Sequence, residues 1–148
     1  MSISKYLWML VILASCATAK NFYDASSQIT FKKTPCFGRC PEFTLTIKGD
    51  GNCILNGTKN ITHIGNFNLK LDDAETKSIF EDFQKAGFDT LQEKYLSKAT
   101  DLPSSIFTLT HNGKTKTVTA QMGMPDALKA IDKRLTELAE RESWKSAE

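Results

Sequence analysis

Apolar and polar residues alternate in several short stretches of the chain, and this period of two predicts half-buried β-strands. The alternating stretches are residues 28–33, 42–48, 52–56 and 67–71. Gly49, Asp50 and Gly51 separate the second stretch from the third, and these residue types favour a tight turn. The second and third strands are therefore expected to form a hairpin.

A second hairpin is predicted in the C-terminal third of the chain. Residues 105–119 alternate again, and Asn112-Gly113 in their middle is the strongest short-range signal for a two-residue hairpin turn. One strand is therefore expected on each side of this dipeptide.

Two other stretches have apolar residues every three or four positions, a spacing typical of amphipathic helices. In the first, Asp72 and Glu75 form an acidic variant of a capping box, and Gly87 favours a helix end. We therefore expect a helix from about residue 73 to residue 86. In the second, Pro125 suits a first-turn position and the helix should continue to about residue 141. The apolar stripe of this second helix consists of Leu128, Ile131, Leu135 and Leu138.

The elements follow the order strands, helix, hairpin and helix, without the rhythm of parallel crossovers. This order predicts an α+β fold, with an antiparallel sheet of about five or six strands and two helices packed on one face. A length of 148 residues fits one domain. We place this domain at residues 28–144 and expect a short tail at 145–148.

The first residues have the pattern of a secretory signal. Lys5 is followed by an apolar run from Tyr6 to Ala14, and a run of this length is much shorter than the roughly 20 residues that span a bilayer. The sequence Leu13-Ala14-Ser15-Cys16 resembles the lipobox of bacterial lipoproteins. The resemblance implies a signal peptide at 1–15, cleavage before Cys16 and acylation of its sulfur. Residues 16–27 would then be the lipidated cysteine and a flexible tether.

Ala17, the residue after the predicted lipidation site, bears on the location of the protein. In lipoprotein sorting, the absence of Asp at this position resembles an outer-membrane address. The expected location is therefore the cell envelope, with the protein anchored by lipid in the outer membrane and facing the periplasm. The expected partners are the membrane, through the anchor, and an unknown envelope protein or ligand.

Charge does not point to a different class of partner. The formal net charge of +2 comes from 19 basic and 17 acidic residues without a basic block, so nucleic acid is not an expected partner.

The sequence contains no nucleophile elbow, phosphate-binding glycine loop or zinc-spaced histidine pair. We therefore expect no cofactor and no enzymatic activity. His63 and His111 are interpreted as surface or loop residues, with His111 exposed beside its hairpin turn.

The cysteines at positions 36, 40 and 53 remain after Cys16 is set aside. In an oxidising compartment such cysteines pair by default. Cys53 lies opposite about Ile47 in the simplest register and hence far from Cys40, so Cys36 and Cys40 are the expected pair. Cys53 is then expected to be a small buried hydrophobic residue.

Two more specific functional hypotheses for Cys36 and Cys40 stay open, a Cu(I) site and a redox-active pair. Cys-x-x-x-Cys-Pro resembles the copper site of cytochrome-oxidase assembly chaperones, and Cys36 and Cys40 could bind Cu(I) together with Met122 and Met124. Alternatively, Arg39 could lower the pKa of a neighbouring thiol and make the pair redox-active.

Several motifs together resemble an uncharacterised bacterial domain family of unknown function that often occurs in lipoproteins. Its signature is a Cys-x-Gly-x-Cys-Pro-x-aromatic loop, an Asp-Gly hairpin and a later Asp-x-Pro. The matching residues are Cys36, Gly38, Cys40, Pro41, Phe43, Asp50, Gly51, Asp101 and Pro103. The resemblance spans about Ile29 to Trp144 and implies no catalytic residue. The sequence thus favours a lipid-anchored, non-enzymatic binding or structural module, with a periplasmic thiol-redox or copper-handling protein as the alternative.

Overall fold

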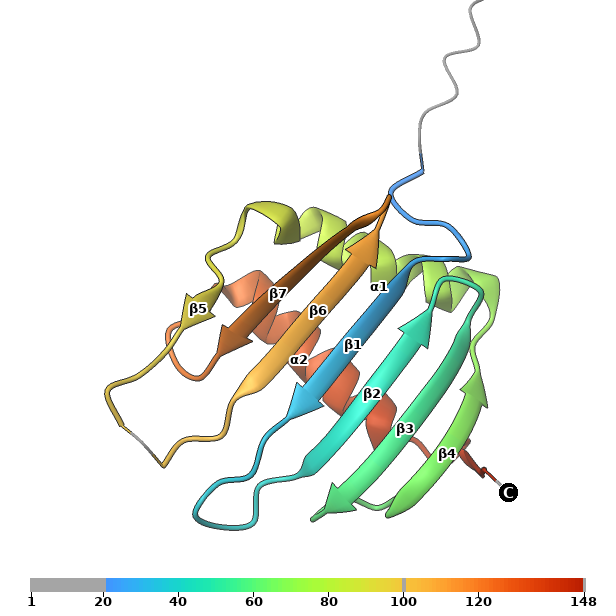
Figure 1. Cartoon of the computed structure of the whole chain (residues 1–148). Coiled ribbons are helices and arrows are strands. Elements are labelled where there is room, and N and C mark those ends of the chain that lie inside the picture. The colour runs from blue at the N-terminus through green and yellow to red at the C-terminus, as the bar shows by residue number, and fades with distance from the viewer. Residues whose placement is uncertain (1–20, 100, 148) are drawn as a thin grey trace, which may run out of the picture.

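The computed structural model describes residues 21–99 and 101–147. The predicted signal peptide and Cys16 lie outside these residues. The described part is an α+β domain in which one sheet is covered on one face by two helices (Figure 1). The sheet differs in detail from the prediction, because it has eight strands in the order β5-β7-β6-β1-β2-β3-β4-β8. It is also mixed and not purely antiparallel, since β5 pairs with β7 in parallel.

The elements follow the predicted order. The first strands are β1 (Gln28–Lys33), β2 (Glu42–Lys48), β3 (Asn52–Lys59) and β4 (Gly65–Lys70). Then come helix α1 (Asp73–Lys85), the 3-10 turn η1 (Phe88–Thr90), β5 (Lys94–Tyr95), β6 (Ser105–His111) and β7 (Lys114–Ala120). The chain ends with helix α2 (Asp126–Ala139) and β8 (Lys145–Ser146).

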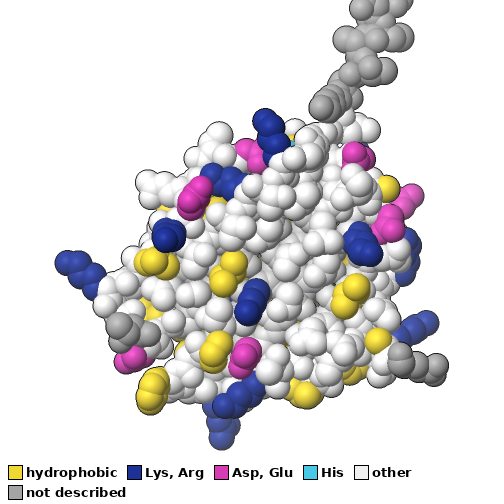
Figure 2. Space-filling view, in the orientation of Figure 1, with side chains coloured by type: hydrophobic (Ala, Val, Ile, Leu, Met, Phe, Trp, Pro, Cys, Tyr) yellow, Lys and Arg dark blue, Asp and Glu magenta, His cyan; other side chains and the backbone are white. Residues whose placement is uncertain are grey.

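The alternation of residues along the strands separates the two faces of the sheet. Apolar side chains such as Ile29, Phe31 and Leu45 point to the face that the helices cover, and all three are fully buried. The opposite face is open to solvent and carries mostly uncharged polar residues (Figure 2). On this open face Thr108 and Thr117 lie opposite each other, and their hydroxyl oxygens are 3.0 Å apart.

The helices have the predicted buried sides, and α1 has nearly the predicted ends, whereas α2 has Pro125 as its N-cap and ends at Ala139, two residues before the predicted end. The carboxylate of Asp72 accepts a hydrogen bond from the backbone N–H of Glu75 at 2.7 Å, and Gly87 follows α1 in the left-handed conformation. Helix α1 buries Ile79, Phe80 and Phe83 against the sheet. The predicted stripe of leucine and isoleucine residues on α2 is buried in the same core. None of the helices in the described ranges is long and apolar enough to cross a membrane.

Both edges of the sheet carry two-residue strands that the sequence pattern does not predict. At one edge β5 pairs with the end of β7. At the other edge β8 pairs with β4, so part of the predicted tail at 145–148 belongs to the sheet. A strand of two residues has no period, and its position depends on hydrogen bonds to a neighbouring strand.

The domain also begins before the first strand. Phe22 and Tyr23, which fall within the predicted tether, pack against the core, and the Tyr23 ring stacks on Phe80 with centroids 4.2 Å apart. Ser27 is buried, and its backbone N–H donates to the Asp24 carbonyl at 3.0 Å. Residues 21–27 therefore form a folded segment on the domain.

The connections gather at two ends of the sheet (Figure 1). We call one the disulfide end; it consists of residues 34–41, 60–64, 96–99, 101–104 and 121–125. We call the other the N-terminal end; it consists of residues 21–27, 49–51 and 112–113. Residue 21, where the described chain starts, thus lies at the end of the sheet away from Cys36 and Cys40.

Candidate functional site

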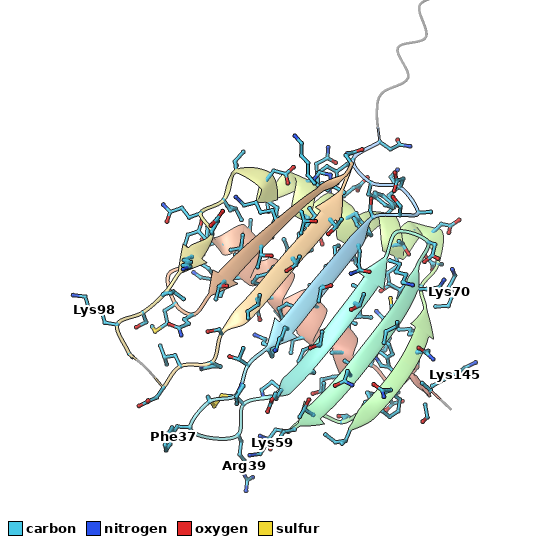
Figure 3. All side chains as sticks on the ribbon, viewed as in Figure 1. Phe37, Arg39, Lys59, Lys70, Lys98 and Lys145 are labelled. Carbon is cyan, nitrogen blue, oxygen red and sulfur yellow. A yellow bond between two sulfur atoms is a disulfide. The ribbon has the colours of Figure 1, made fainter. Side chains whose placement is uncertain are left out.

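The loop between β1 and β2 contains the predicted disulfide. Cys36 and Cys40 are bonded to each other, with their Cα atoms 5.7 Å apart, and both are half-buried. The three residues between them are exposed. The bridge therefore closes a short loop whose tip projects from the disulfide end (Figure 3).

Hydrogen bonds hold this loop to its neighbours at the disulfide end. The backbone N–H of Thr34 donates to the Ser104 carbonyl at 3.0 Å, and the Ser104 N–H donates to the Thr34 hydroxyl at 2.7 Å. On the other side the Asn60 amide donates to the Cys40 carbonyl at 3.1 Å. Segments far apart in the sequence are thus fixed relative to one another.

The same network continues to the connection between β7 and α2. The Gln121 amide nitrogen donates to the Ser104 hydroxyl at 3.2 Å, while its amide oxygen accepts from the Ser97 N–H at 3.0 Å. Gln121 therefore joins the segment after β5 to the segment before β6. This residue is a structural part of the end that the sequence motifs did not indicate.

The side chains at the tip of the disulfide loop are apolar and basic. Phe37 is 94% exposed, and Arg39 is exposed beside it. Lys59 lies near this tip, and Lys98 projects from another connection of the same end (Figure 3). The exposed ring adds nothing to the packing of the core.

A shallow cavity of about 290 Å³ lies beside the loop. It is lined by Pro35, Cys36, Phe37, Asp101 and Leu102. The structure thus brings the Cys-x-x-x-Cys loop and the Asp-x-Pro segment together, although about sixty residues of sequence separate them.

Three other residues of the predicted motif, Phe43, Asp50 and Gly51, belong to the core or to a turn. Phe43 is buried in the core, with its ring centroid 5.7 Å from that of Phe31. Asp50 and Gly51 form the β2–β3 turn at the N-terminal end. Gly51 has φ of +84°, and a Cβ there would lie 2.7 Å from the Leu71 carbonyl oxygen, so this position requires glycine. The motif therefore divides into a group at the disulfide end and a turn at the opposite end.

The predicted Cu(I) ligands are not brought into one cavity. Cys36 lines the cavity beside the disulfide loop, whereas Met124 lines a separate one with Lys33 and Ser105. Met122 is 63% exposed. Among the described residues, no group of three or more His, Cys, Asp or Glu side chains is placed to hold a metal ion.

Cys53 is buried in β3, as expected. It pairs with Ile47, and its Sγ atom contacts the Gly51 carbonyl oxygen at 3.6 Å. Burial, together with the nearby Glu75 and Asp50 carboxylates, raises the pKa of the Cys53 thiol to about 12. The thiol is therefore a poor nucleophile and a poor metal ligand in the folded protein.

The cavity next to Met124 has a polar floor that sequence analysis missed. The Lys33 ammonium donates to the Asp132 carboxylate at 2.6 and 2.8 Å and to the Ser105 hydroxyl at 2.9 Å, and Ser105 also donates to Asp132. A serine next to a lysine is one arrangement used for nucleophilic catalysis. Here, however, Lys33 and Ser105 both donate to the same Asp132 carboxylate, which is the arrangement of a structural ion pair. The cluster joins α2 to β1 and β6.

His111 is buried, which corrects the expectation that it is exposed. One ring nitrogen lies 2.9 Å from the Phe22 carbonyl oxygen, and the other lies 3.0 Å from the carboxylate of Asp89. The ring is also 4.4 Å from the Phe22 ring. His111 therefore helps to hold residues 21–27 on the domain. His63 contacts the Arg141 carbonyl oxygen at 2.8 Å, so it also has a structural partner.

Comparison with known families agrees with the predicted membership of an uncharacterised domain family. No curated protein sequence matches the chain significantly. Residues 27–139, however, match the family model described as Domain of unknown function (DUF6438). The matched range runs from the start of β1 to the end of α2 and contains the disulfide loop. Because this match covers well over half of the chain, the protein belongs to the DUF6438 family of domains of unknown function.

Proposed function

We propose that this protein is a lipid-anchored module of the bacterial cell envelope that acts by binding and not by catalysis. The anchor is supported by the signal-like N-terminus and the lipobox-like sequence ending at Cys16. Binding is supported by the disulfide loop, whose tip presents Phe37 and Arg39 to solvent.

The observation that carries the proposal is the position of the N-terminal segment. Residue 21 lies at the end of the sheet opposite the disulfide loop (Figure 1). Four residues, 17–20, lie between it and Cys16, so the five steps of chain would reach only about 17 Å even when fully extended. A domain anchored in this way would have its N-terminal end near the membrane and its disulfide end directed away from it.

The anchor is tested by mass spectrometry of the full-length protein isolated from membranes of a bacterial host. The expected product starts at Cys16 and carries the mass of a diacylglyceryl group, with or without a further acyl chain. The Cys16→Ser variant should lose the acyl mass and leave the membrane fraction. A wild-type product that retains its first fifteen residues would contradict the proposal.

A thiol-redox or copper-binding role is the second candidate, because the residues between Cys36 and Cys40 are exposed and a reductant can reach the bridge. Reduction would take two electrons and two protons from an external dithiol, which becomes a disulfide, and would leave two protein thiols able to bind Cu(I). The test is a Cu(I) titration of the reduced protein against the Cys36→Ser/Cys40→Ser variant. Stoichiometric binding that the variant loses would favour this role over the first.

A further inference from the structure

Exposed apolar side chains are concentrated at the disulfide end. In the described part of the chain, the strongly exposed large apolar residues at this end are Phe37 (94%), Met122 (63%), Ile64 (58%) and Leu96 (55%). They come from separate connections of the sheet. The remaining one, Ile54, lies on the open face of the sheet and is 43% exposed. Single exposed apolar residues are ordinary, but several at one end of a small domain indicate an interaction surface.

The connections that carry these side chains are held in place. The disulfide closes the Phe37 loop, and the bonds of Thr34 with Ser104 and of Asn60 with Cys40 fix this loop to both of its neighbours. Gln121 fixes the segments near Leu96 and Met122. The surface is thus preorganised, which lowers the entropy lost on binding.

Exposed basic side chains lie at the same end of the sheet as the exposed phenylalanine. Arg39 follows it in the loop, and Lys59 and Lys98 are exposed at the same end (Figure 3). Of the carboxylates at this end, Asp101 is exposed, whereas Glu42 and Glu140 are half-buried and Glu140 accepts from the Thr62 N–H, so the three exposed cations outnumber the exposed carboxylates. A partner with acidic groups around an apolar depression would match both the ring and its charges.

We infer that the disulfide end is the docking surface for a protein partner that has an acidic rim and an apolar pocket for Phe37. This inference rests on the proposed binding function and names its surface and its partner class. The fixed spacing of the side chains suits a partner with a defined shape, whereas a fluid bilayer would need no such spacing. In turn, the cavity of about 290 Å³ beside the loop can receive a partner side chain.

Photo-crosslinking in living cells tests the surface. The full-length protein carries p-benzoylphenylalanine at position 37 or, as a matched control, at position 54 on the open face. Irradiation is expected to give a protein adduct from position 37 that is absent from position 54. Combining the probe with Arg39→Glu and Lys59→Glu should lower the yield of this adduct about tenfold, because like charges would face each other.

Lys70→Glu is the charge control, since Lys70 is exposed at the other end of the sheet, where its ammonium donates to the Asp50 carbonyl at 2.5 Å. This variant should leave the adduct unchanged. A lipid adduct, equal adducts from positions 37 and 54, or a yield unaffected by charge reversal at Arg39 and Lys59 would each overturn the inference. The two proposals are tested separately by making the crosslinking variants in a Cys16→Ser chain and adding this chain to solubilised membranes. If this chain gives the specific adduct from position 37 while the wild-type protein carries no acyl mass, the docking surface is valid and the anchor is rejected.

Discussion

At the scale of single residues, the reactivity of the free cysteine follows from its position in the sheet. Cys53 faces the core from β3, and burial raises its pKa to about 12. In a Cys16→Ser chain with the Cys36–Cys40 bridge intact, Cys53 is the remaining thiol. We expect iodoacetamide at pH 8 to modify it only after denaturant is added, because the thiolate is the reactive form. Intact-mass measurement checks this, and equal rates with and without denaturant would contradict the structure.

A surface ion pair gives a second prediction at this scale. The guanidinium of Arg141 donates to the Glu75 carboxylate at 2.6 and 3.1 Å and lowers the pKa of Glu75. Since this pKa is lower in the folded than in the unfolded protein, the pair stabilises the fold above the unfolded value of about 4.3. The stabilisation is lost as the pH falls through the folded value.

The variant Arg141→Met should therefore be less stable than the wild type at pH 7, by less than about 1 kcal/mol because both groups are partly exposed. At pH 2.5 the difference should be smaller. Urea denaturation at the two pH values measures it, with Lys98→Met as a control for the loss of an exposed charge. A difference that stays constant between the two pH values would show that the ion pair does not cause it.

At the scale of elements, the cluster of Lys33, Ser105 and Asp132 joins a helix to the sheet. The side chains of Lys33 and Asp132 are each only 18% exposed. Asp132→Ala would leave the Lys33 ammonium without its carboxylate, and we expect a loss of about 3 kcal/mol in the free energy of unfolding. Adding Lys33→Met should recover part of this loss.

Urea denaturation at neutral pH measures these variants. Asp126→Ala is the matched control, because Asp126 also pairs with a lysine, Lys129 at 2.7 Å, but on the exposed side of α2. It should have no measurable effect. If Asp132→Ala were as mild as this control, the cluster would not be holding α2 on the sheet.

The bounds of the strands also show which parts of the fold the sequence pattern predicts. β1 and β2 have the predicted bounds because each alternates over six or more residues. β3 extends to Lys59 through residues that read as a polar turn, because pairing with its neighbours determines where it ends. No pattern links Lys33 with Asp132, which are 99 residues apart, and their contact depends on the packing of α2.

In the candidate site, too, local features were predictable from the sequence, whereas contacts between distant segments were not. The Cys36–Cys40 bridge was predicted from the spacing of the cysteines and from an expected oxidising compartment, and the bond is present. The presence of Phe37, Ile64, Leu96 and Met122 at one end of the sheet was not predictable, because the sequence does not show which loops share an end. His111 was interpreted as exposed because it is next to a turn, whereas Phe22 and Asp89, distant in sequence, enclose it.

At the scale of the whole molecule, the C-terminal segment completes the domain although the family match ends at residue 139. Trp144 is buried, and its indole N–H donates to the Leu138 carbonyl at 2.9 Å. The two residues of β8 that follow are exposed. Most of the stabilisation from this segment should therefore come from the indole.

Two truncations of the full-length protein separate the contributions of Trp144 and β8. A chain that ends at Trp144 removes β8 and should lose little stability, since β8 forms only two residue pairs with β4. A chain that ends at Arg141 also removes the indole and should lose about 3 kcal/mol or more, the usual cost of deleting a buried tryptophan side chain. Thermal and urea denaturation compare the two chains. If both lost the same stability, the edge strand would be closing the domain, and Trp144 would not be the residue that anchors its C-terminus.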